Sequence, residues 1–196
     1  SFLCCYNLMK TLLTLFVLLF SSSMFADDIS DFEIEGMSIG DSALDFFSEK
    51  QIRENKWDYP NKKYKRVQND NLPFFNIYDA VDFNYKTGDK RYMIHSLSGI
   101  FLYEHNVEDC YPKMDLIINN LKGNFNPIEF LDKETFKHQN DPTGKSVFTD
   151  AVFRFKSGDI VVTCYDYSEE KGDTDHLSVS IDTIEFNNWL IDEAYK

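Results

Sequence analysis

Three residues have the side-chain types of a nucleophilic catalytic site. Ser42 ends a Gly40-Asp41-Ser42 block, and Asp173 and His176 form an Asp-x-x-His block near the end of the chain. A serine hydroxyl is a weak nucleophile until a base accepts its proton, and a carboxylate can orient an imidazole for that role. In such a site Ser42 would attack, His176 would take its proton and Asp173 would orient the imidazole.

These two blocks resemble the signature blocks of the SGNH, or GDSL-type, ester hydrolases. The resemblance implies acyl transfer at Ser42, with Gly123-Asn124 similar to the family's oxyanion-hole Asn. The chain departs from the family around the blocks. Acids interleave residues 31–35, where the family has a buried parallel strand, and hairpin patterns replace strand–helix–strand crossovers. We therefore commit to no catalytic residue and keep a small serine ester hydrolase as the alternative function.

An acidic loop is the second candidate site. Carboxylates are the ligands that Ca²⁺ prefers, and exported proteins meet millimolar Ca²⁺, but the spacing in this loop is not that of an EF-hand. The histidines show no zinc-ligand spacing. We expect a solvated loop, no metal and no cofactor. The loop carboxylates are Asp166, Glu169, Glu170, Asp173 and Asp175.

Tyrosines are the third candidate. They could line a concave sheet face that binds a ligand or a partner protein, or they could be core and surface residues of an antiparallel sheet. The sequence leaves both interpretations open. The tyrosines concerned are Tyr78, Tyr85, Tyr92, Tyr103, Tyr165 and Tyr167.

The composition bounds the classes of partner. The chain has 196 residues, enough for one domain, and a formal net charge of −13. An acidic chain repels the phosphate backbone, so nucleic-acid binding is disfavoured. The one basic cluster, at residues 62–66, reads as a solvated loop and strand edge.

The first 26 residues have the pattern of a targeting segment rather than of part of the folded domain. Lys10 precedes the apolar run Leu12–Phe20, and small residues follow up to Ala26. This is the layout of a secretory signal peptide, and the run is too short to span a membrane. We expect Met9 to be the true start, cleavage after Ala26, and a mature chain with no membrane span.

Cleavage would leave two of the four cysteines, Cys110 and Cys164. An even pair in an exported protein predicts a disulfide, although two buried free thiols are the alternative. The bridge would close a loop of about 55 residues, which the chain-entropy model values at roughly 4 kcal/mol.

The most β-prone stretch is Ile160–Tyr167, and it predicts the middle strand of a C-terminal meander. A long strand is expected over Phe74–Tyr85, and a bulge or bend at Gly99. Helices are predicted near Ser42–Ile52, from Asp109 to Gly123, and after Asp182 or Thr183. Capping boxes are expected between Ser48 and Gln51 and between Asp182 and Glu185. The apolar stripe of the middle helix consists of Met114, Ile117, Ile118 and Leu121. The segment 124–146 is expected to have the least structure.

Two stretches, Ala80–Asp89 and Ala151–Asp159, look alike. They are either a duplicated hairpin-plus-helix unit or two hairpins with the same turn chemistry. In both cases short turns between consecutive strands predict an antiparallel sheet. The fold class is therefore α+β: hairpins packed with a few helices, as one domain over residues 27–196.

A further resemblance covers Ile34–Ser42, which follows the signal peptide and reads Ile-Glu-Gly-Met-Ser-Ile-Gly-Asp-Ser. It looks like the mature N-terminus of small exported proteins of marine planktonic bacteria, a group without an assigned activity. The resemblance implies a periplasmic or secreted protein. We expect a non-catalytic binding or structural protein of the envelope, whose partner is a protein or a small molecule.

Overall fold

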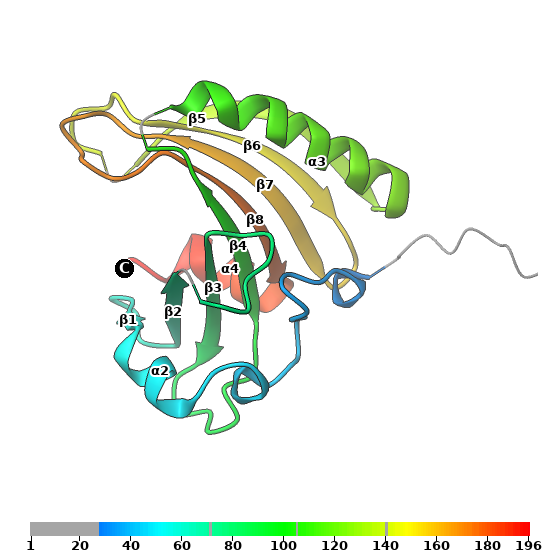
Figure 1. Cartoon of the computed structure of the whole chain (residues 1–196), viewed down its shortest axis with the longest axis vertical. Coiled ribbons are helices and arrows are strands. Elements are labelled where there is room, and N and C mark those ends of the chain that lie inside the picture. Colours follow the sequence, from blue (N-terminus) through cyan, green and yellow to red (C-terminus); the bar gives the residue numbers. More distant parts are fainter. Residues whose placement is uncertain (1–27, 71, 105, 140) are drawn as a thin grey trace, which may run out of the picture.

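The computed structural model describes residues 28–70, 72–104, 106–139 and 141–196, so the expected leader and signal peptide lie outside the described residues. An antiparallel sheet of eight strands, in the order β1-β2-β3-β4-β8-β7-β6-β5, organises the chain (Figure 1). The predicted α+β class is confirmed. Among the residues described, no helix has the length and apolar character needed to cross a bilayer.

The sheet consists of two meanders that meet where β4 pairs with β8. Each meander is built by antiparallel pairing of consecutive strands, as short connections favour. The predicted C-terminal meander is confirmed, with the Ile160–Tyr167 stretch in its third strand. The strands are β1 Lys56–Asp58, β2 Tyr64–Asp70, β3 Ala80–Lys86, β4 Ser96–Leu102, β5 Glu129–Lys137, β6 Val147–Arg154, β7 Gly158–Asp166 and β8 His176–Thr183.

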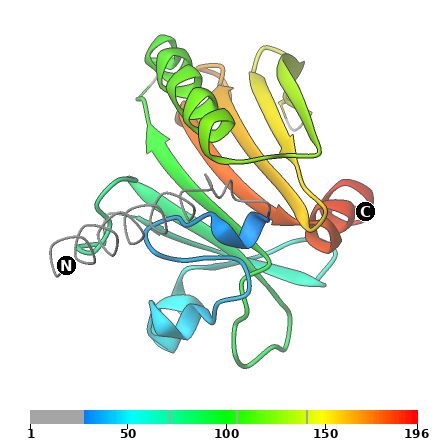
Figure 2. The ribbon, with the colours of Figure 1, turned by 90° about the vertical axis from the view of Figure 1, so that its right-hand side faces the viewer.

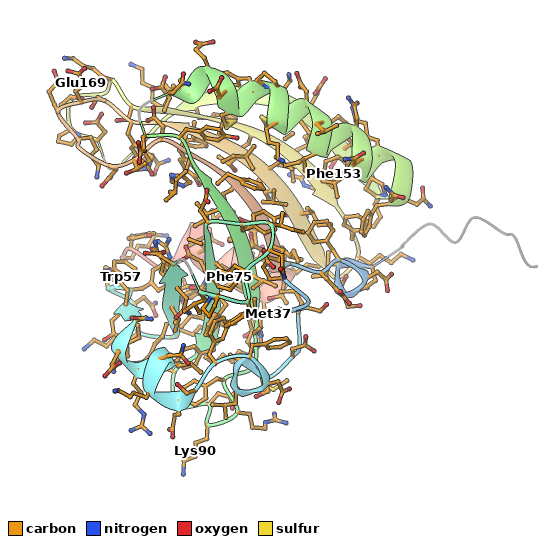
Figure 3. The ribbon with its side chains drawn as sticks, in the orientation of Figure 1. Met37, Trp57, Phe75, Lys90, Phe153 and Glu169 are labelled. Carbon is orange, nitrogen blue, oxygen red and sulfur yellow. A yellow bond between two sulfur atoms is a disulfide. The ribbon has the colours of Figure 1, made fainter. Side chains whose placement is uncertain are left out.

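One face of the sheet carries the main hydrophobic core. Alternate residues of each strand point to the same face, so Leu177, Val179 and Ile181 of β8 are all fully buried there. Residues 28–47, which precede the first strand, and helix α3 cover this face (Figure 2). Met37, Phe75 and Phe153, labelled in Figure 3, come from three separate parts of the chain and all pack into or against this core.

The helices begin where the sequence places caps. Ser48 and Gln51 form the predicted capping box of α2 (Glu49–Glu54), and Ser42 caps the short 3₁₀ helix Ala43–Asp45. Helix α4 (Ile184–Asp192) is capped by Thr183. The predicted box between Asp182 and Glu185 is wrong, because Asp182 is buried in β8 and Glu185 pairs with Lys86.

Helix α3 (Cys110–Asn124) is tied to the sheet by the predicted disulfide. Cys110 in its first turn is bonded to Cys164 in β7, with Cα atoms 6.0 Å apart. The buried stripe of the helix consists of Cys110, Met114, Ile118 and Leu121. The disulfide therefore fixes the same helix face that packs on the core.

The long strand predicted over Phe74–Tyr85 is wrong in its first half. The backbone N–H groups of Asn76, Ile77 and Tyr78 all donate to the carboxylate of Glu35, at 2.7–2.9 Å. These groups are therefore unavailable to a sheet ladder. The segment turns, Ile77 is exposed, and the strand starts only at Ala80.

The prediction of little structure over residues 124–146 is also wrong, because β5 lies within it. This edge strand is mostly exposed, and its register with β6 shifts between Leu131 and Glu134. Exposure and a bulge blur the alternation by which a half-buried strand is recognised.

The two look-alike stretches play different parts. Lys86 ends β3 and Gly88 then adopts a positive φ of 85° in a turn, whereas Gly158 is the first residue of β7 and has no positive φ. The first hairpin leads to α3, and the second leads to β8. The two stretches therefore do not hold equivalent places in two copies of one hairpin-plus-helix unit.

Gly99 lies in regular register with Val81 and Val179, so the predicted bulge is wrong. Its role is close packing, since a Cβ there would lie 2.6 Å from the ring of Tyr78.

Replacing both bridged cysteines by alanine should lower the free energy of unfolding by about 4 kcal/mol, because the unfolded chain regains the entropy of an open loop. Urea unfolding under non-reducing conditions measures this. The reduced wild type is the control and should move in the same direction. A loss below about 1 kcal/mol would contradict a stabilising bridge.

Gly158→Ala should destabilise the fold by about 3 kcal/mol, because the added Cβ would lie 2.0 Å from the backbone oxygen of Asp182. Gly123→Ala is the matched control. It places the same methyl group in open space on α3 and should be neutral or stabilise by up to about 1 kcal/mol. Equal unfolding midpoints for the two variants would show that this close approach is absent.

Candidate functional site

The face of the sheet opposite the core is polar at its centre. Ser98 of β4 lies beside Ser180 of β8, which in turn lies beside Val161 of β7. Partners in antiparallel register share a face, so these strands place a row of short side chains side by side. Ser178 and Thr163 form the next row. The middle of the sheet therefore presents short hydroxyl side chains, flanked by the apolar side chains of Val161 and Ile100.

These hydroxyl groups bond to one another. The Oγ atoms of Ser98 and Ser180 are 2.9 Å apart, and those of Ser178 and Ser180 are 3.1 Å apart. A second chain runs alongside, in which the Tyr59 hydroxyl donates to Asn84 and Asn84 donates to Ser96. Polar groups buried on the floor are thus largely satisfied, which limits the cost of keeping them there.

Two buried carboxylates stand at the edge of this floor. Asp82 of β3 accepts hydrogen bonds from Nε and Nη2 of Arg66 through one oxygen, Oδ2. Its other oxygen receives no hydrogen bond from the described residues. Burial raises the pKa of Asp82 despite the neighbouring guanidinium.

Asp182 of β8 is the second buried carboxylate. Burial raises its pKa to about 6, the nearby charge of Asp159 acts in the same direction, and a hydrogen bond from Ser96 opposes them. The floor therefore contains a carboxyl group that changes charge close to neutral pH.

Aromatic rings form one end of the polar face. The ring centroids of Tyr165 and His176 are 4.5 Å apart and those of Tyr165 and Tyr167 are 5.8 Å apart, in stacked arrangements. Burial lowers the pKa of His176, so its imidazole is neutral at pH 7. Burial also raises the pKa of Tyr167 to about 12. This end is thus an uncharged aromatic wall.

Helix α4 and the C-terminal residues close the opposite end. Trp189 and Phe186 pack against Tyr64 of β2, and Asn187 donates to Asp159 at 2.8 Å. This second, smaller aromatic core holds α4 on the polar side of the sheet.

The floor, the wall and α4 enclose a cavity of about 370 Å³. A second cavity of about 440 Å³ shares Arg66, Ile100, Tyr167 and His176 with it. We call the two together the concave groove. In Figure 3, Glu169 lies in the β7–β8 loop, which projects beyond the strands, and Trp57 lies in the edge strand β1.

The structure does not assemble the candidate triad. The Ser42 hydroxyl donates to the backbone oxygen of Arg91, and His176 Nδ1 bonds to the backbone oxygen of Thr174. Asp173 pairs with Lys171. His176 lines the concave groove and Ser42 does not. His176 begins the central strand β8.

The acidic loop is held by protein contacts. Asp175 accepts from the backbone of Tyr167, and Glu170 pairs with Lys145. Within the described ranges, no group of three potential metal ligands gathers. Of the candidate tyrosines, Tyr165 and Tyr167 line the groove, while Tyr78, Tyr85, Tyr92 and Tyr103 pack on the core side.

Sequence reasoning missed the serines, Arg66, Asp82 and Asp182. A signal was present, since Ser178 and Ser180 alternate with Leu177, Val179 and Ile181. Alternation of small polar and apolar residues is also what a solvated sheet face shows, so the pattern does not identify a groove without the neighbouring strands.

Asp182→Asn should remove a pH-dependent part of the stability. The raised folded pKa means that protonated Asp182 stabilises the fold fully below the unfolded value near 3.8, and that this contribution is lost as pH rises through about 6. The wild type should therefore lose about 2 kcal/mol relative to the variant between pH 4 and pH 7. Urea unfolding across this range measures the difference, and parallel pH profiles would show that Asp182 titrates normally.

Comparisons with protein-family models, with curated proteins and with solved structures found no match. The two resemblances drawn from the sequence therefore stay predictions. The function has to be argued from the groove itself.

Proposed function

We propose that this protein is a non-catalytic, exported binding protein whose concave groove receives a small polar ligand. The observation that carries the proposal is the floor of short hydroxyl side chains at the centre of the sheet, between β4 and β8. Short side chains at this position leave a cavity of about 370 Å³, which is within the usual size of ligand pockets.

The floor differs from an ordinary solvated sheet face. A face that simply meets water can carry long charged side chains, which cover the strands beneath them. Here Ser96 and Ser178 are buried, and Ser98 and Ser180 are half-buried. Burying hydroxyl groups without filling the space above them brings no packing gain, so binding is the better explanation.

The residues around the opening of the groove would orient a bound ligand. Arg66 and Asp82 stand on one side, the aromatic wall on another, and α4 with Tyr195 on a third. A few polar groups that converge on a cavity with aromatic walls are typical of small-molecule sites.

Export to the periplasm or beyond is part of the proposal. It is supported by the disulfide between Cys110 and Cys164, since such bonds persist in oxidising compartments. The sequence pattern before Ala26 supports it independently.

A thermal-shift screen of sugars, amino acids, polyamines and nucleosides tests the binding function. We expect at least one class to raise the unfolding temperature, and we expect its amide chemical-shift changes to map to β4, β7 and β8. Ser180→Leu would fill the floor and should weaken that ligand at least tenfold, since a buried side chain would take its space.

Thr135→Leu is the matched control, because it exchanges a strand hydroxyl for the same side chain in the edge strand β5, outside the groove. It should leave affinity unchanged. Unfolding of both variants without ligand shows that each is folded. A ligand that binds Ser180→Leu as tightly as the wild type would contradict the groove as the binding site.

A further inference from the structure

The hydrogen-bonding groups of the concave groove are mixed. Ser98, Ser178 and Ser180 can each donate and accept, the carboxylates of Asp82 and Asp182 accept when ionised, and the guanidinium of Arg66 donates. Asp82 is more than nine-tenths buried, and its Oδ1 has no donor among the described residues. A ligand that matches this surface must both donate and accept at several neighbouring positions, as a row of hydroxyl groups does.

The aromatic wall places three stacked rings beside that floor, and the ammonium of Lys171 lies 6.0 Å from the centroid of the Tyr167 ring. The ring planes of Tyr165 and Tyr167 differ by 5°, and those of Tyr167 and His176 differ by 30°. The face of an aromatic ring is its electron-rich side, which attracts weakly polarised C–H bonds. A sugar ring combines such a C–H face with hydroxyl groups around its edge.

Charge decides against an anionic ligand. Arg66 is the only cationic side chain lining either cavity among the described residues, and it is already paired with Asp82. Asp70 and Asp173 add negative charge to the second cavity. A carboxylate, sulfate or phosphate would enter this field without a free cation to pair with.

The two cavities extend the groove from α4 towards Leu102, and Tyr167 and His176 line both. This shape favours a ligand longer than one ring. We propose that the groove binds a short, uncharged saccharide of two or three linked sugar rings, stacked on the wall at Tyr167 and hydrogen-bonded to the hydroxyl floor at Ser98 and Ser180. This inference rests on the binding function proposed above.

Isothermal titration calorimetry and saturation-transfer NMR test the proposal with defined probes. Both use the protein with its disulfide formed and without residues 1–26. The neutral probes are cellotriose, laminaritriose, chitotriose and α-1,4-mannotriose. Trigalacturonate is the anionic probe and spermidine the cationic one. We expect at least one neutral trisaccharide to bind, and trigalacturonate to bind at least tenfold more weakly than that one.

Tyr167→Ala should weaken the bound trisaccharide about tenfold, because the wall loses the ring that lines both cavities. Tyr103→Ala is the control, since Tyr103 packs on the core side and lines neither cavity. It should leave the affinity unchanged. Equal losses in both variants would show a general effect on the fold, and would overturn the placement of the sugar on the wall.

The outcomes separate the two proposals. If spermidine or another compound binds in the groove and no trisaccharide does, the saccharide inference fails and the binding function stands. Tighter binding of trigalacturonate than of any neutral probe would also overturn the inference. If chemical-shift mapping finds no compound of any class in the groove, the binding function fails with it.

Discussion

The pairing of β4 with β8 is the contact on which the rest of this structure depends. Each of the two meanders can form from local turns, but only this pairing joins them into one sheet. This pairing sets which side chains lie next to each other on both faces of the sheet. On one face Leu97 lies beside Ile181 in the core, and on the other Ser98 lies beside Ser180 in the groove. Because side chains alternate along a strand, a shift of one residue would exchange core and floor.

The core face favours this register of β4 against β8, because it places apolar side chains such as Leu97 and Ile181 side by side. Gly99 lets the ring of Tyr78 pack directly against β4, and Gly158 lets β7 lie close to the backbone of Asp182 in β8. The disulfide then holds α3 against the same face. With the main core on the other face, the centre of the polar face can keep short side chains beside the cavity.

How much of this the sequence could predict depends on the range of each interaction. The disulfide, the capping box at Ser48 and the apolar stripe of α3 follow from residue types and short spacings, and all were predicted. The pairing of β4 with β8 joins positions far apart in the chain, and no local pattern specifies it. The strand predicted over Phe74–Asp79 is wrong for the same reason. Its backbone N–H groups donate to the carboxylate of Glu35, which lies about forty residues earlier in the chain.

The groove itself was foreseen only at its aromatic end. Tyr165 and Tyr167 stand out in the sequence, whereas the alternation around Ser180 is the same as that of a solvated sheet face. The serines lie together only because the pairing of β4 with β8 joins the two meanders. A ligand on that floor would contact both meanders across their seam, and its binding energy would add to the pairing of β4 with β8. The same contact that completes the fold would then be the one that recognition strengthens.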